Sequence, residues 1–135
     1  MNPFDHVSIV GVGLLGGSLA KAMRKLGLAK SLVGYGRNKA NLEEAKNLGI
    51  IDHVASDIQS AVKDADLIVL CSPVRAMGQL IIKMNPFDHV SIVGVGLLGG
   101  SLAKVMRKLG LAKSLVGYGR NKANLEEAKN LGIID

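Results

Sequence analysis

Three observations predict an α/β protein with a three-layer, doubly wound parallel sheet. Apolar segments of strand length alternate with helix-length segments along the 135 residues, which is the pattern of parallel strands joined by helices. The first strand runs into the glycine loop 11–16, whose spacing is Gly-x-Gly-x-x-Gly. Residues 84–135 repeat residues 1–52, so the same order of elements returns. Together these features predict a Rossmann-like sheet of about six strands.

The repeat is nearly perfect. The two copies differ at a single position, where Ala22 of the first copy is Val105 of the second, and Met84 stands at the position of Met1. Such identity indicates a whole coding start joined in frame to another segment, as in an engineered chimera, or else a very recent duplication. We expect a single domain over residues 1–135, in which residues 84–135 supply the last two strands.

The first copy begins with a strand and an amphipathic helix. Residues 6–12 are almost continuously apolar, which is typical of a strand covered on both faces. A helix is predicted over residues 14–26, followed by a strand at 31–35 and a helix at 38–49 that ends at a glycine. The buried stripe of the first helix is predicted to comprise Leu15, Leu19, Ala22, Met23 and Leu26.

Four more elements complete residues 1–83, and the second copy then adds two strands and two helices. Residues 53–56 form a short strand, 57–63 a helix, 66–71 a strongly apolar strand, and 73–83 a helix that opens with a proline, which suits a first helical turn. Because crossovers between parallel strands are right-handed, the expected strand order is 3-2-1-4-5-6.

Composition excludes several classes of function. The net charge is +6, but the basic residues form no single run, and two Tyr, two Phe and no Trp leave few rings to stack on bases. We therefore expect no nucleic acid as a partner. No apolar run approaches the ~20 residues of a membrane span, and the N-terminus lacks the pattern of a signal peptide. The single cysteine, Cys71, is expected to be a reduced packing residue in a cytoplasmic protein without a metal site.

The loop 11–16 predicts a dinucleotide site. Gly11 permits a tight turn, Gly13 lacks the Cβ that would hold a pyrophosphate away from the backbone, and Gly16 lets the helix pack closely on the strand. The helix N-terminus adds free amides and a dipole worth roughly 0.3–1 kcal/mol to a bound phosphate. A glycine-rich turn without a ligand is the alternative. The candidate residues of the loop are Gly11, Val12, Gly13, Leu14, Leu15 and Gly16.

The end of the second strand indicates which dinucleotide binds. Asp or Glu usually stands there and binds the ribose hydroxyl of NAD, whereas this chain has Gly36, followed by Arg37 and Asn38. Nothing then repels a 2′-phosphate, and a charged hydrogen bond from Arg37 contributes about 1.5–3 kcal/mol. NADP is therefore preferred over NAD, unless Arg37 is only a solvated loop residue.

The second glycine loop is expected to differ from the first despite its identical sequence. Dinucleotides bind where the winding of the sheet reverses, and only the first loop borders that point, between the first and fourth strands. We expect one dinucleotide site per chain and, at the second loop, at most a phosphate or mononucleotide site; a purely structural turn is the alternative. The residues of this second candidate site are Gly94, Gly96, Leu98, Gly99 and Arg120.

Residues 1–83 resemble the N-terminal nucleotide-binding part of the prephenate and arogenate dehydrogenases of tyrosine biosynthesis. The resemblance rests on S-I-V-G-V-G-L-L-G-G-S-L-A-K, V-G-Y-G-R-N, A-K-N-L-G-I-I-D and A-D-L-I-V-L-C-S-P-V-R. It implies that the glycine loop holds the pyrophosphate and that the loop after the second strand reads the ribose. It also implies that Ser72, Pro73 and Val74 lie near the nicotinamide. Gly36 stands where members of the family commonly have Asp.

The resemblance ends at residue 83. The catalytic histidine of the family, in a Gly-His-Pro segment, has no counterpart, because His6, His53 and His89 do not match that motif. We therefore expect a dinucleotide-binding module that is not an enzyme and has no catalytic residue. The alternatives are residual dehydrogenase activity, an inert scaffold, or a homodimer, including swapped forms in which copied segments exchange between chains.

Overall fold

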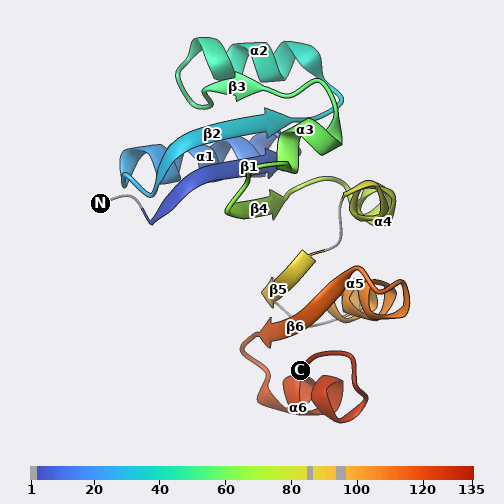
Figure 1. The fold of residues 1–135 in the computed structure, drawn as a ribbon. Coiled ribbons are helices and arrows are strands. Elements are labelled where there is room, and N and C mark those ends of the chain that lie inside the picture. The colour runs from blue at the N-terminus through green and yellow to red at the C-terminus, as the bar shows by residue number, and fades with distance from the viewer. Residues whose placement is uncertain (1–2, 85–86, 94–96) are drawn as a thin grey trace. The chain divides into compact units, whose positions relative to one another are not determined.

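The computed structural model describes residues 3–84, 87–93 and 97–135, which belong to two compact units, Met1–Met84 and Asn85–Asp135 (Figure 1). The elements of the first unit are β1 (Phe4–Val10), α1 (Leu14–Lys25), β2 (Ala29–Tyr35), α2 (Lys39–Asn47), β3 (His53–Val54), α3 (Ile58–Val62), β4 (Leu67–Leu70) and α4 (Val74–Lys83). Those of the second are β5 (Phe87–Val93), α5 (Leu97–Lys108), β6 (Ala112–Tyr118) and α6 (Lys122–Asn130). Every predicted strand and helix is present. None of the described helices is long and apolar enough to cross a membrane.

The first unit has a parallel four-stranded sheet in the order β3-β2-β1-β4. At the centre, Val7 of β1 is aligned with Leu32 of β2 on one side and with Leu67 of β4 on the other. This arrangement confirms the α/β class and the predicted order 3-2-1-4. The chain winds outward from β1 to β3 and then returns to β4, so the winding reverses between β1 and β4.

The second unit has a parallel pair, β5-β6, with the register of β1-β2: Val90 is aligned with Leu115 as Val7 is with Leu32. The strands of the described residues thus belong to one four-stranded and one two-stranded sheet. A pairing of β4 with β5, and with it a single six-stranded domain, stays a prediction.

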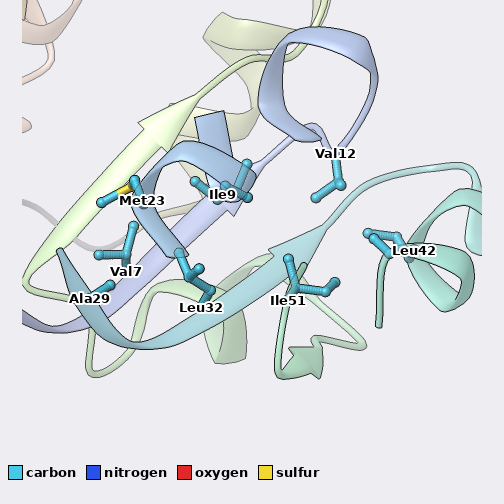
Figure 2. Close-up of a cluster of buried hydrophobic side chains, with 10 residues drawn as sticks. Val7, Ile9, Val12, Met23, Ala29, Leu32, Leu42 and Ile51 are labelled. Carbon is cyan, nitrogen blue, oxygen red and sulfur yellow. The ribbon is translucent and has the colours of Figure 1, made fainter. Parts of the chain in front are cut away.

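The main core of the first unit lies between the sheet and the helices α1 and α2 (Figure 2). Side chains alternate across the sheet, so Leu32 enters this core while Val33 and Tyr35 lie on the opposite face. There α3 contacts β1 and β2, and Figure 1 shows α1 and α3 on opposite faces of the sheet. The labelled core residues are Val7, Ile9, Val12, Met23, Ala29, Leu32, Leu42 and Ile51.

The predicted stripe of α1 was wrong except at Met23. Leu15 and Leu26 are 72% and 67% exposed, and the buried residues of the helix are Gly16, Ala20 and Met23. The helix lies so close to the sheet that a Cβ at Gly16 would collide with the carbonyl oxygen of Gly11. Small residues therefore face the sheet, and the larger leucines are displaced toward solvent.

Asp52 joins the end of the first copy to the sheet. Its Oδ2 accepts a hydrogen bond from the backbone N–H of Leu32 at 2.8 Å and pairs with Arg24 at 2.9 Å. Burial by itself raises the pKa of Asp52, but these hydrogen bonds outweigh it and hold the pKa below its ordinary value of 3.8. The second unit repeats the arrangement with Asp135, which accepts from Leu115 at 2.7 Å and pairs with Arg107 at 2.9 Å.

Candidate nucleotide-binding site

The loop after β1 is held between the two neighbouring strands. The N–H of Gly11 donates to the carbonyl oxygen of Tyr35, at the end of β2, at 2.7 Å. Gly11 has φ +98°, and a Cβ on it would lie 2.7 Å from the carbonyl carbon of Cys71 and 2.8 Å from the nitrogen of Ser72. Both the backbone conformation and the close packing therefore require glycine here.

Gly13 and the start of α1 form the open part of the loop. Gly13 is the N-cap residue of α1, and a Cβ on it would meet nothing within 4 Å. The first N–H groups of a helix have no partner within the helix, and the first turn of α1 contains no acidic residue. Leu14 and Leu15 beside it are 93% and 72% exposed. The site thus combines free space, backbone donors and the positive end of a helix dipole, which together suit a pyrophosphate.

The end of β4 lies directly against this loop. The N–H of Cys71 donates to the carbonyl oxygen of Val10 at 2.7 Å, and burial raises the pKa of the Cys71 thiol, which suits packing better than nucleophilic chemistry. The buried Oγ of Ser72 has no hydrogen-bond partner among the described residues. Pro73 is the N-cap residue of α4, and Val74 is its first residue. Ser72 therefore offers an unused hydroxyl beside the glycine loop.

The end of β2 forms the third side of the candidate site. A Cβ on Gly36 would lie 3.7 Å from the nitrogen of Val12 and 4.0 Å from the Cα of Gly11, so Gly36 adjoins the loop with space to spare. Arg37 is exposed. The side-chain oxygen of Asn38 accepts from the N–H of Asn41 at 3.1 Å and caps α2. Gly36 and Arg37 are thus available to a ligand, whereas the Asn38 oxygen is engaged in the helix cap.

The second candidate site is described only in part. Gly94 and Gly96 lie outside the described residues, as does the side chain of Leu98. Gly99 is half-buried in α5, and Arg120 is exposed after β6. Because the repeat covers only residues 1–52, the second unit contains no copy of β4 or of the residues around Ser72.

Two contacts that position the strands of the first unit were missed by the sequence analysis. Asp66 accepts from the N–H groups of Asp5 and His6, at 2.8 and 2.9 Å, and so joins the start of β4 to β1. A Cβ on Gly34 would lie 2.6 Å from Cδ1 of Ile51. A glycine inside a strand is the signal that could have revealed this close approach.

Each unit also has a shallow basic hollow at the C-terminal end of its first helix, with volumes of about 350 and 340 Å³. Lys and Arg at a helix C-terminus complement its dipole, which gives these cations a structural role. The lining residues are Lys21, Arg24, Lys25, Leu48, Gly49 and Ile50 in the first unit, and Lys104, Arg107, Lys108, Leu131, Gly132 and Ile133 in the second.

The fold and the glycine loop of the first unit define a dinucleotide-binding α/β domain. The family model described as the nucleotide-binding domain of prephenate dehydrogenase matches residues 19–95. The chain belongs to this family. It is 40% identical over 109 residues to a cyclohexadienyl dehydrogenase of Zymomonas mobilis, over 79% of this chain and 37% of that relative.

Solved structures agree with this assignment. The prephenate dehydrogenase from A. aeolicus in complex with hydroxyphenyl propionate and NAD+ is similar with a TM-score of 0.52 and 29% identity, over 91% of this chain and 37% of that one. The Synechocystis arogenate dehydrogenase gives a TM-score of 0.54 and 27% identity, over 72% and 37% of the two chains. The chain thus spans little more than a third of the length of these relatives.

These relatives correct one expectation. The prediction that the chain is not an enzyme rested on the missing catalytic histidine motif. The relatives are dehydrogenases, so that prediction was wrong, and the chain is part of a dehydrogenase family. This chain spans little more than a third of the length of such a relative, so the absence of one motif from it was a poor guide.

Proposed function

We propose that this chain is the cofactor-binding part of a prephenate- or arogenate-type dehydrogenase and binds one dinucleotide at the carboxyl ends of β1, β2 and β4. The observation that carries this proposal is the combination of Gly11, packed against both neighbouring strands, with Gly13, which faces open space at the start of α1. The substrate class follows from the names of the relatives.

The residues fit the parts of the cofactor. Backbone amides around Gly13 bind the pyrophosphate, Gly36 and Arg37 take the adenosine ribose, and the residues after β4, Ser72 to Val74, border the nicotinamide. The bound nicotinamide would accept a hydride from the substrate. In this proposal Ser72, whose buried Oγ has no partner among the described residues, donates a hydrogen bond on the nicotinamide side.

NADP is the proposed preference. Arg37 is exposed, Gly36 has no carboxylate to repel a 2′-phosphate, and Gly36 adjoins the loop with room for a ligand. NAD is the alternative, since the A. aeolicus relative was solved with NAD+.

We also propose that the second copy is the product of in-frame engineering, and that the chain can form a homodimer by exchange of segments when the packing of residues 53–83 on the first copy is disrupted. The first inference rests on the near-identity of the copies and on Met84 at the seam. The second inference rests on the fact that the segment from β3 to β4 occurs once, whereas the copy on which it packs occurs twice.

Binding of NADP and NAD to the full chain, measured by fluorescence titration, tests the proposed function. Gly13→Ala should abolish binding and leave the unfolding midpoint unchanged, because a Cβ there meets no protein atom within 4 Å. Gly17→Ala is the matched control, since its Cβ also meets nothing within 4 Å but lies a turn away from the pyrophosphate. Equal affinity in Gly13→Ala and the unsubstituted chain would overturn the proposal.

A further inference from the structure

Residues 53–83 occur once, whereas the copy on which they pack occurs twice. In the first unit this segment, which comprises β3, α3, β4 and α4, covers three parts of residues 1–52. The strand β3 pairs with the outer edge of β2, α3 contacts β1 and β2 on the face opposite α1, and β4 pairs with β1. The docked helix α3 buries Ile58, Ala61 and Val62.

In the described part of the second unit, no element of that unit lies on the equivalent face as α3 does in the first. Leu115, on the α5 side of β6, is as buried as its counterpart Leu32, both at 0% exposure. On the other face Val116 is 53% exposed and Tyr118 is 71% exposed, whereas their counterparts Val33 and Tyr35 are half-buried. The difference follows the face on which α3 lies in the first unit.

This uncovered surface is already shaped for residues 53–83. The register of β5-β6 equals that of β1-β2, and the N–H of Asp135 donates to the carbonyl oxygen of Leu115 at 2.7 Å, as that of Asp52 donates to Leu32 at 2.8 Å. The N–H of Ala55 continues this pattern in the first unit by donating to Gly34. The one residue that differs between the copies, Val105, lies on α5 and not on β6.

Chain connectivity prevents residues 53–83 from docking in the same way on the second copy of their own chain. The helix α4 shares a face of the sheet with α3, which it contacts. If β5 took the place of β1 beside β4, the connection β4-α4-β5 would become left-handed, whereas such crossovers are right-handed in about 98% of cases. A segment from another molecule has no such constraint.

We propose that the β5-β6 sheet of the second unit forms a second docking surface for the β3-α3-β4 segment, and that its occupant is this segment of a second copy of the chain. On that surface residues 53–83 would pair and pack as they already do with the first copy. Exchange of this segment between two chains therefore adds no stabilising interaction, and it costs the translational and rotational freedom of two separate chains. The intact chain stays monomeric, and the second surface fills when the first one is damaged.

Two matched substitutions test this assignment in the full chain. Val33→Asp puts a carboxylate on the docking face of the first copy, and Val116→Asp puts it at the equivalent position of the second, where the side chain is exposed. Cys71, the only cysteine, directly follows β4, so the rate at which its thiol reacts reports whether the segment is docked. Light scattering gives the mass of each variant.

The Val33→Asp chain should form dimers at high concentration in which Cys71 reacts as slowly as in the unsubstituted chain, and dilution should expose the thiol. Val116→Asp alone should behave like the unsubstituted chain. The double variant should stay monomeric, with Cys71 reacting at least about tenfold faster at every concentration. Leu32→Asp, at a fully buried position, repeats the test with the first surface removed outright.

Two results would overturn the assignment. One is a Val33→Asp chain whose Cys71 reacts as fast as that of the double variant at all concentrations. The other is slow reaction in a monomeric Leu32→Asp chain, which would place the segment on its own second copy.

Discussion

The two copies share all but one residue, yet they differ in what surrounds them. Both form a parallel strand pair in the same register and cap the following helix in the same way, through Asn38 and Asn121 at 3.1 Å. Only the first copy shares its unit with β4, whose end packs against the glycine loop at Gly11. Local structure therefore follows the sequence of the copy, whereas the proposed competence to bind a cofactor follows its neighbours.

Burial separates the copies in the same way. Leu42 of α2 is 2% exposed, whereas the equivalent Leu125 is only half-buried. Leu32 and Leu115, which face their own helices, are equally buried. The residues that change environment are those that residues 53–83 surround in the first unit, so substitutions at matched positions should have unequal effects.

The largest expected difference is at the first glycine of the loop. Gly11→Ala should abolish cofactor binding and lower the free energy of unfolding of the first unit by about 3 kcal/mol, because it combines a strained φ with a collision against the backbone of Cys71 and Ser72. Chemical denaturation followed by circular dichroism measures this. Gly49→Ala, which also has positive φ but meets no atom within 4 Å, isolates the cost of strain. Equal costs in the two variants would contradict a packed loop.

Arg37 and Arg120 should differ in their effect on cofactor choice. Arg37→Ala should weaken NADP binding by about 1.5–3 kcal/mol, roughly 10- to 100-fold, and leave NAD binding unchanged, because only NADP has the 2′-phosphate. Arg120→Ala should change neither affinity. Calorimetric titration with both cofactors provides the measurement, and a parallel loss for NAD would show that Arg37 does not read the 2′-phosphate.

The ion pair at Asp52 should make the first unit sensitive to acid. The pKa of Asp52 is lower in the folded chain than the ordinary 3.8. The contribution of its carboxylate to the free energy of unfolding is therefore complete above pH 3.8 and is lost as the pH falls through the folded-state pKa. Asp52→Asn should cost about 1 kcal/mol at neutral pH, since the pair is partly exposed, and little at acid pH. A cost that does not change with pH would contradict this role.

Effects as small as that of Asp52→Asn are expected at the two helix caps. Asn38→Ala and Asn121→Ala should each destabilise their own unit by about 1 kcal/mol, because each removes an equivalent hydrogen bond to the start of a helix. Thermal unfolding of the two variants checks this. Clearly unequal losses of stability in the two variants would show that even a helix cap depends on the elements around it.

Much of the fold was predictable, because strand periodicity, helix caps and the handedness of crossovers all act locally or generally. The order of the four strands in the first unit followed from these rules. The strands β1 and β2 begin at Phe4 and Ala29, two residues earlier than predicted, because these residues are aligned across the pair. The periodicity of a sequence does not show which residues will be aligned in neighbouring strands.

The glycine loop was predictable where its geometry requires glycine, as at Gly11 and Gly16, and less so where side chains are concerned. The exposed Leu14 and Leu15 fall in a helix whose apolar residues predict burial. The exposure of these leucines is not encoded by spacing alone, because it depends on how closely the start of α1 approaches the sheet. The contact of Asn38 with the cofactor stays a prediction, since the side-chain oxygen of Asn38 caps α2.

The stoichiometry of cofactor binding tests the central claim most directly: the elements around a glycine loop, and not its sequence, determine whether the loop binds a cofactor. Calorimetric titration of the full chain with NADP should give close to one site per chain, and the heat should disappear in Gly13→Ala but persist in Gly96→Ala. Two equal, tight sites per chain, or binding that survives Gly13→Ala and is lost in Gly96→Ala, would contradict this account.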